Sequence, residues 1–336
     1  MNRREKILHK LDLTGEGLEI GPLCWPVLQK DEGKVQYVDH LTRGALLKVY
    51  ADDKSVPPDQ IVDIDYALNG RTLHQTVPQS KQFNYIIASH VMEHVPDLVR
   101  WFNDLSSVLK VGGVISLAVP DKRFTFDIDR HPSSPADVVG AYIDNLAKPA
   151  SATILDYATN YRMHVDAGQV WAGNLYLGST APHRYSYTQA LDLCDANKKH
   201  YVDTHCYVFT PHSFIEILRV LIELDLLRLK VVSFFDTPEN LYEFYISLQK
   251  MPKATSKRDL LESLPTLSRS PYPRELEANI KNLENEITNL RNTTLAQHRE
   301  LQFVLQSKSW RLTRPIRYGV RQARRIKRKL RQHTLG

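Results

Sequence analysis

Short apolar runs alternate with amphipathic helical patterns between Gly17 and Lys250, and this alternation constrains the fold more than any other feature of the sequence. It is typical of a parallel sheet, because each strand must be followed by a crossover that returns along the sheet. The runs predict parallel strands at residues 17–20, 35–38, 61–64, 83–88 and 114–119. Two later runs, 229–235 and 242–248, predict an antiparallel hairpin. The sequence therefore predicts a doubly wound α/β fold with a mostly parallel, seven-stranded sheet.

The remaining segments predict additions to this domain, which we place at residues 1–250. Residues 124–207 are rich in Asp, His, Pro and Tyr and weakly periodic, so we interpret them as an inserted lid or substrate wall. Residues 251–274 are typical of a linker. Residues 275–308 carry apolar side chains in steps of four and three, which predicts a coiled-coil helix and a homo-oligomer. A single helix folded onto the domain is the alternative.

Residues 309–336 form a basic tail. The formal net charge of the chain is +6, and Arg311 to Arg331 contain ten Lys/Arg and no acid, so the rest carries 6 − 10 = −4. Trp310, Leu312 and Ile316 can share one helical face beneath these charges. This pattern predicts an amphipathic helix on an anionic membrane surface, which we favour over binding of nucleic acid and over a solvated tail.

The sequence has no apolar run of the roughly 18 to 20 residues that a membrane span needs, and its first residues do not have the pattern of a signal peptide. We therefore expect a cytoplasmic protein, peripheral on the inner membrane if the tail binds lipid.

Five motifs carry a resemblance to a known family. They are Leu18-Glu-Ile-Gly-Pro22, Tyr37-Val-Asp-His40, Ala88-Ser-His-Val-Met-Glu-His-Val95, Val108-Leu-Lys-Val-Gly-Gly113 and Val119-Pro-Asp-Lys-Arg-Phe124. In these the chain resembles the class I S-adenosylmethionine-dependent methyltransferases, and among them bacterial enzymes that accompany glycosyltransferases in surface-polysaccharide synthesis. The resemblance implies a Rossmann-like domain, S-adenosyl-L-methionine as cofactor, and a hydroxyl of a sugar or lipid-linked glycan as acceptor. The alternatives are an RNA methyltransferase and an inactive scaffold for glycan enzymes.

The predicted cofactor site lies beyond the carboxyl ends of the parallel strands, where the strand order reverses. The residues that we place there are Glu19, Gly21, Asp39, Asp65, Ser89 and His90. Gly21 lets the cofactor approach the backbone, Asp39 can accept hydrogen bonds from ribose hydroxyls, and Asp65 can accept one from the adenine amino group. Ordinary turn chemistry is the alternative for both aspartates. The chain departs from the family pattern in having Gly21-Pro-Leu-Cys-Trp-Pro26 in place of a glycine-rich loop, which motivates the scaffold alternative.

His90, Asp121 and Arg123 are the predicted catalytic residues. By the resemblance, His90 lies where side chains face the transferred methyl group, so we expect a base or an acceptor-positioning residue. The alternative is a histidine that shapes the methionine end of the cofactor site. Arg123 can hold an anionic acceptor or pair with Asp127.

We interpret Glu93 and His94 as structural residues at the entry to the next helix. The histidines of the insertion show no close helical spacing, so the sequence predicts no metal site.

Overall fold

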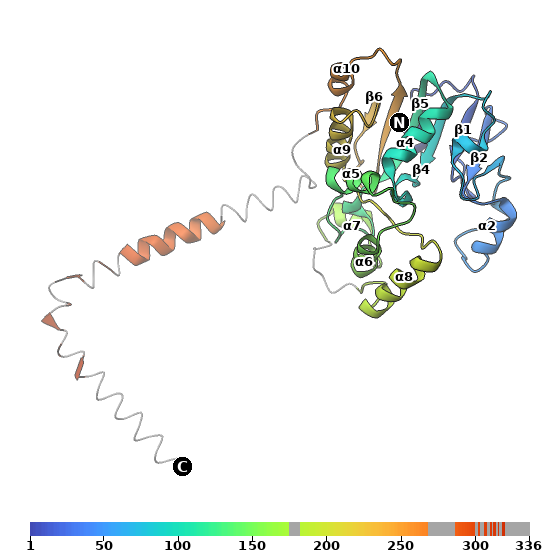
Figure 1. Cartoon of the computed structure of the whole chain (residues 1–336). Coiled ribbons are helices and arrows are strands. Elements are labelled where there is room, and N and C mark those ends of the chain that lie inside the picture. Colours follow the sequence, from blue (N-terminus) through green and yellow to red (C-terminus); the bar gives the residue numbers. More distant parts are fainter. Residues whose placement is uncertain are drawn as a thin grey trace. The chain divides into compact units, whose positions relative to one another are not determined.

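The computed structural model describes residues 1–174, 182–267 and 286–299, together with single positions between 302 and 319. The chain divides into two compact units, Met1–Tyr272 and Pro273–Gly336. All labelled strands and helices belong to the first unit (Figure 1). The predicted site residues also lie in this unit, so the fold is described for it first.

Within the described residues, seven strands form one sheet in the order β3-β2-β1-β4-β5-β7-β6 (Figure 1). The strands are β1 (Gly17–Ile20), β2 (Val35–Asp39), β3 (Tyr66–Ala67), β4 (Phe83–Ser89), β5 (Leu109–Pro120), β6 (Leu229–Phe235) and β7 (Glu243–Lys250). The first five are parallel, and β7 is antiparallel to both β5 and β6. The strand order reverses between β1 and β4, as the predicted doubly wound fold requires.

The helices are α1 (Arg3–Leu8), α2 (Arg43–Val49), α3 (Leu73–Thr76), α4 (Leu98–Val108), α5 (Pro135–Ile143), α6 (Ser151–Asn160), α7 (Ala167–Trp171), α8 (Tyr187–Lys199), α9 (Pro211–Glu223) and α10 (Lys257–Glu262). Short 3-10 turns are η1 (Pro58–Gln60), η2 (Met92–His94) and η3 (Lys122–Phe124). Helix α9 begins where the sequence favours a helix start, because Thr210 caps the helix and Pro211 occupies its first turn.

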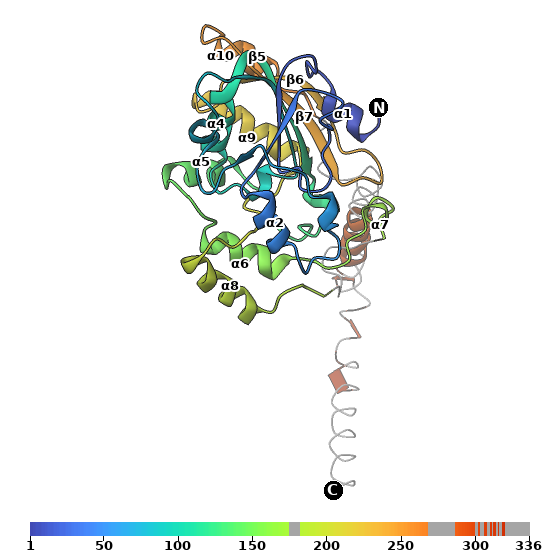
Figure 2. The ribbon, with the colours of Figure 1, turned by 90° about the vertical axis from the view of Figure 1, so that its right-hand side faces the viewer.

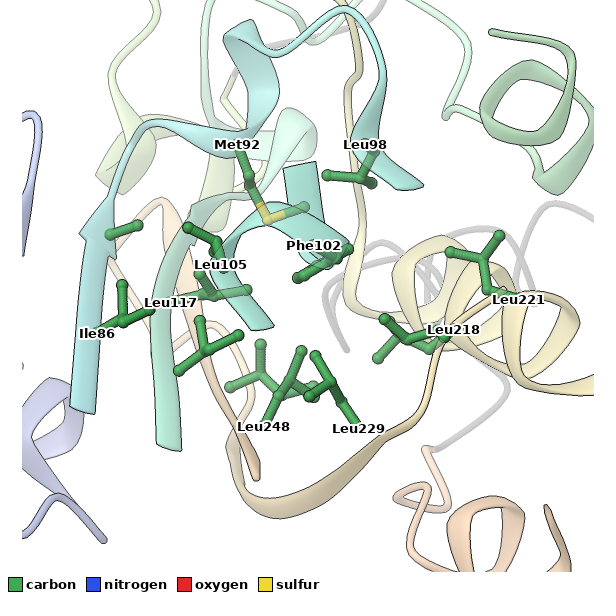
Figure 3. Close-up of a cluster of buried hydrophobic side chains, with 14 of the residues drawn as sticks. Ile86, Met92, Leu98, Phe102, Leu105, Leu117, Leu218, Leu221, Leu229 and Leu248 are labelled. Atoms are coloured by element: carbon green, nitrogen blue, oxygen red, sulfur yellow. The ribbon is translucent and has the colours of Figure 1, made fainter. Parts of the chain in front are cut away.

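The main core lies on one face of the sheet. Alternation along the strands separates its two faces, so that Ile86 of β4 belongs to this core and Ile87 to a smaller one on the other face. Helices α4 and α9 close the main core with Phe102 and Leu218, whose side chains gather with strand residues in Figure 3. The smaller core is covered by α1 through Ile7.

The predicted third strand is placed wrongly. Residues 61–64 are not a strand, and β3 is the two-residue strand Tyr66–Ala67 beside the end of β2. Ile61 instead packs in a small separate core with Cys24, and the Val62 N–H donates to the Leu23 carbonyl at 2.9 Å. The apolar side chains that suggested a strand therefore pack against the loop after β1.

The segment predicted as an insertion contains α5 to α8 between β5 and α9. Figures 1 and 2 both show α6 and α8 side by side, away from the sheet at one end of the unit. The predicted lid region is therefore largely helical, and its residues 175–181 lie outside the described part of the chain.

Of the second unit, the structure describes a helix at residues 286–299, within the segment predicted as a coiled coil. Most other residues of that segment, and most of the basic tail at 309–336, lie outside the described residues. Among the described residues, no helix is both long and apolar enough to cross a membrane.

Candidate functional site

The side chain of Glu19 holds the loop after β1 through hydrogen bonds to its backbone. This residue of β1 is buried, and its carboxylate accepts hydrogen bonds from the backbone N–H groups of Val27 at 2.6 Å and Leu28 at 3.1 Å. Burial raises the pKa of Glu19 to about 7, although both hydrogen bonds favour the ionised form. The structure therefore gives Glu19 a supporting role under the loop, and direct contact with a cofactor stays a prediction.

Gly21 occupies a position where a side chain would be strained. Its φ of +64° lies in the left-handed region, and a Cβ atom there would lie 3.1 Å from Cγ2 of Val91. Its N–H donates to the carbonyl of Val38 in β2 at 2.8 Å. Gly21 therefore lies where the loop after β1 approaches both β2 and the loop after β4, and the approach of a cofactor to its backbone stays a prediction.

Asp39 is the last residue of β2, and only one of its two carboxylate oxygens accepts a hydrogen bond from the described residues. The side chain is 5% exposed, and Oδ1 accepts from the backbone N–H of His40 at 2.7 Å and lies 2.6 Å from His40 Nδ1. The hydrogen bond to Asp39 raises the pKa of His40 against the opposing effect of burial. No hydrogen bond among the described residues uses Oδ2 of Asp39, so that this oxygen can accept one from a ligand at the strand end.

Asp65 does not end a strand, and this part of the prediction is wrong. It precedes β3 and lies beside Tyr37, whose N–H donates to Asp65 Oδ2 at 2.7 Å. Lys30 Nζ lies 2.7 Å from the same oxygen. Both contacts tie Asp65 to the side of β2, and a contact with adenine remains untested.

His90 follows β4 in a conformation that is rare for a non-glycine residue, with φ of +55°. Its Nε2 lies 2.8 Å from Oε2 of Glu243, the first residue of β7. Arg3 of α1 donates to Glu243 Oε1 through Nε at 2.6 Å and to Ser89 Oγ through Nη2 at 2.7 Å. Burial alone would raise the pKa of Glu243, but the hydrogen bonds from His90 and Arg3 outweigh it and lower the pKa to about 2. His90 is therefore held by an ionised carboxylate.

A cavity of about 780 Å³ lies beside His90. His90 and Pro120, at the ends of β4 and β5, line its wall, as does Tyr242, the residue that precedes β7. The insertion contributes the remaining aromatic and cationic wall, which includes Phe126 and Tyr161. Residues of the insertion therefore line the cavity, and their role as a substrate wall stays a prediction.

Asp121 and Arg123 form an ion pair with each other. Asp121 is fully buried, and its Oδ2 accepts from Arg123 Nη2 at 2.6 Å and from the hydroxyl of Thr237 at 2.7 Å. The partner of Arg123 is thus Asp121, whereas Asp127 pairs with Arg130 at 2.9 Å. Neither Asp121 nor Arg123 lines the cavity. The geometry describes a structural pair at the end of β5, and a catalytic role for these two residues stays a prediction.

The sequence analysis missed several residues that the structure places at the cavity. Glu93 and His94, interpreted as structural, line it together with His205 of the insertion. Glu243 was missed as the partner of His90. One signal was available for it, because an antiparallel strand beside β5 must begin at the edge where the parallel strands end.

Residues 36–220 match the family described as "Methyltransferase domain". The match covers more than half of the 336 residues, and the chain therefore belongs to this family. With the doubly wound sheet and the site at its carboxyl edge, the protein is an S-adenosylmethionine-dependent methyltransferase. No similar protein was found among curated sequences.

Several solved structures resemble this one. A putative Zn-dependent alcohol dehydrogenase from Rhodobacter sphaeroides is 14% identical, with a TM-score of 0.39, over 74% of this chain and 89% of the other. The glycopeptide N-methyltransferase MtfA, complexed with sinefungin, is 11% identical with a TM-score of 0.36, over 75% and 86%. An S-adenosylmethionine-dependent methyltransferase from Clostridium acetobutylicum is 9% identical with a TM-score of 0.37, over 74% and 89%. Identities and TM-scores this low carry no functional conclusion.

Proposed function

We propose that this methyltransferase acts on a hydroxyl group of a sugar or lipid-linked glycan of the cell surface, with His90 as the base. The observation that carries the proposal is the contact between His90 and Glu243 at the wall of the cavity. Removing the proton from a hydroxyl makes its oxygen a better nucleophile, and a positioned histidine contributes about 10²- to 10⁴-fold to such a step.

The residues at the carboxyl ends of β1 and β2 fit the cofactor. Gly21 has no side chain, and a Cβ atom at its position would contact Val91, so the backbone of this loop is open to the cofactor. Asp39 has a carboxylate oxygen that can accept a hydrogen bond from the ribose hydroxyls. We place Ser89, the last residue of β4, and His90, the next residue, beside the same cofactor. S-adenosylmethionine supplies, when bound, a methyl group made electrophilic by its positive sulfonium. The departure from a glycine-rich loop matters little here, because this cofactor has no pyrophosphate that needs backbone N–H groups.

The pairing with Glu243 decides which nitrogen of His90 is available. An ionised carboxylate can only accept hydrogen bonds, so Nε2 of His90 carries a proton and donates the hydrogen bond to Glu243. This leaves Nδ1 unprotonated in the neutral ring, and Nδ1 is the atom that takes the acceptor's hydroxyl proton. Arg3 keeps Glu243 ionised and in place through its own hydrogen bond.

The composition of the cavity wall supports a sugar as acceptor. Phe126 and Tyr161 stack with ring centroids 4.3 Å apart, and the guanidinium of Arg184 lies 5.1 Å from the centroid of Tyr161. All three residues line the cavity. Aromatic faces pack against the C–H faces of pyranose rings, and an exposed arginine can pair with the phosphate of a lipid-linked or nucleotide-linked sugar. The glycan itself is proposed from the family resemblance of the sequence.

The tail and the helix of the second unit extend this proposal. We infer that residues 309–336 hold the enzyme against an anionic membrane surface, where lipid-linked acceptors accumulate. We also infer that residues 275–308 join copies of the chain. Both inferences rest on the sequence pattern.

The test of the proposed function is methyl transfer from radiolabelled S-adenosylmethionine to lipid-linked glycan and, separately, to RNA. We expect label in the glycan, and we expect His90→Gln to lower kcat by about 10²-fold or more, with a much smaller effect on the Kd for S-adenosylmethionine. The matched control is His74→Gln, which changes an exposed histidine of α3. Label in RNA alone would favour an RNA methyltransferase over the proposal. An unchanged kcat in His90→Gln would contradict the role of His90 as the base.

A further inference from the structure

A cluster of potential metal ligands lies on the wall of the same cavity. Glu93, His94 and His205 each bring one ligand atom within 4.8 Å of the others, and all three residues line the cavity. Glu93 and His94 belong to η2 after β4, whereas His205 comes from the end of the insertion. The backbone joins these segments, because the Glu93 carbonyl accepts from the N–H groups of Cys206 at 2.6 Å and Tyr207 at 3.1 Å.

Glu93 is buried without a hydrogen-bond partner. Its residue is 1% exposed, and neither carboxylate oxygen accepts a hydrogen bond within the described part of the chain. The nearest basic atom that the structure gives is His90 Nδ1, 3.6 Å from Oε1, which is too far for a hydrogen bond. A buried carboxylate is costly unless a cation or hydrogen-bond donors compensate it. The position of Glu93 therefore points to a group that is bound there.

Both histidines are oriented as metal ligands usually are. His94 Nδ1 lies 2.9 Å from Oδ1 of Asp203, and His205 Nδ1 lies 2.6 Å from Oδ2 of Asp127. Each carboxylate fixes the ring and occupies Nδ1, so that Nε2 of each ring is left for a ligand. Metal-binding histidines almost always donate their second ring N–H to such a partner. The two rings meet at an angle of 86° with centroids 4.7 Å apart.

We propose that Glu93, His94 and His205 bind a divalent transition-metal cation such as Zn²⁺ or Mn²⁺. Two imidazoles and one carboxylate suit these cations, whereas Ca²⁺ and Mg²⁺ favour sites made of oxygen ligands alone. Three protein ligands leave at least one coordination position open toward the cavity, which is the arrangement of catalytic rather than structural sites.

The open position gives the cation a role in acceptor binding, and this part of the inference rests on the proposed function. The cation binds the oxygen of the hydroxyl that is to be methylated, fixes it near His90, and lowers the pKa of that hydroxyl. The hydroxyl proton then passes to His90 Nδ1. Glu93, His94 and His205 thus select acceptors with a hydroxyl that can reach the cation.

The test is titration of the chelator-treated, full-length protein with Zn²⁺ and with Mn²⁺, followed by calorimetry and by metal analysis after dialysis. We expect one equivalent per chain and a rise in the thermal midpoint with added cation, because a ligand that binds the folded state stabilises it. Glu93→Gln and His205→Ala should each lose this binding. His131→Ala, which changes an exposed histidine of the same insertion, should keep it.

A second variant separates ligand orientation from folding. The side chain of Asp203 is 69% exposed, so Asp203→Asn should fold normally, while the weaker hold on His94 should lower cation affinity by about tenfold or more. Absence of binding by the unchanged protein, or equal binding by Glu93→Gln, overturns the proposal. The Kd for S-adenosylmethionine is measured on the same samples. Failure of the metal proposal leaves that Kd and methyl transfer intact, whereas failure of the proposed function appears as absent transfer with the cation bound.

Discussion

Asp39 is the residue whose substitution should affect cofactor binding most directly. In Asp39→Ala the ribose hydroxyls lose their acceptor, and hydrogen bonds to charged groups contribute about 1.5 to 3 kcal/mol each. We expect the Kd for S-adenosylmethionine to rise by about 10- to 100-fold in isothermal titration calorimetry. Asp63→Ala is the control, because the Asp63 side chain is 91% exposed. Full affinity in Asp39→Ala, with an unchanged thermal midpoint, would contradict the ribose assignment.

Glu243 links the candidate base to the N-terminal helix, and its charge should be visible in stability. Its pKa in the folded protein, about 2, lies below the ordinary value of 4.5. The pairing therefore stabilises the fold fully above about pH 5, and the stabilisation is lost as the pH falls toward 2. The difference corresponds to on the order of 3 kcal/mol.

We expect Glu243→Gln to lower the free energy of unfolding at pH 7 and to approach the unchanged protein at pH 3. Urea titrations at both values measure this difference. A deficit that is the same at both values would mean that packing, rather than the charge of Glu243, holds the residue.

Because the neutral amide in Glu243→Gln cannot hold the His90 ring as an ionised carboxylate does, kcat should also fall by about tenfold or more while the Kd for S-adenosylmethionine stays unchanged.

At the scale of elements, the sequence predicted most of the sheet. The buried parts of β4 and β5 are mostly apolar runs, and the hairpin of β6 and β7 was predicted in its antiparallel sense. The third strand failed because an apolar run records burial, and Ile61 is buried in the small core beside the loop after β1 rather than within the sheet. Local pattern cannot distinguish these two environments.

The candidate site was predicted less completely, for a related reason. Asp39 ends β2, and Gly21 and His90 directly follow β1 and β4, so their places at the carboxyl edge could be inferred from the order of elements. Glu243 contacts His90 and Arg3, and Arg3 and Glu243 are 240 residues apart in the sequence, so that no local spacing indicates these contacts. The same holds for His205, because the backbone hydrogen bonds from the residues that follow it to Glu93 place it beside η2.

The element formed by β1 and its loop has a pH dependence opposite in sign to that of Glu243. The pKa of Glu19 in the folded protein is about 7, above its ordinary value of 4.5. Its contribution to stability is therefore fully present below about pH 4.5 and is lost as the pH rises through 7. We expect Glu19→Gln to have a smaller loss of unfolding free energy between pH 5 and pH 8 than the unchanged protein.

Guanidinium titrations at these two pH values test the prediction. The two losses should differ by on the order of 2 to 3 kcal/mol, because each pKa unit corresponds to about 1.4 kcal/mol. Glu16→Gln, which changes a partly exposed residue just before β1, is the control. Parallel pH dependences for Glu19→Gln and the unchanged protein would show that Glu19 is ionised in the fold at neutral pH.

At the scale of the whole molecule, the catalytic unit and the C-terminal unit pose different questions. Met1–Tyr272 contains every residue that the proposed chemistry uses. The helix at residues 286–299 leaves Ile287 at 49% and Leu290 at 61% exposure in the single chain. Apolar side chains at this spacing on a helix are typical of the seam of a coiled coil, where a second helix buries them.

Association of copies of the chain should therefore depend on these two side chains. Burying a leucine or isoleucine contributes about 1.5 to 3 kcal/mol, and each copy in a dimer would bury both. We expect the double variant Ile287→Glu, Leu290→Glu to shift the full-length protein from oligomer to monomer in light scattering coupled to size-exclusion chromatography. Asn292→Glu adds a like charge on the opposite face of the helix, and should leave the oligomer intact. The Kd for S-adenosylmethionine should be equal in all three proteins, since the site lies within one catalytic unit. A monomeric unchanged protein, or an oligomer that survives the double substitution, would assign the apolar stripe to contacts within one chain.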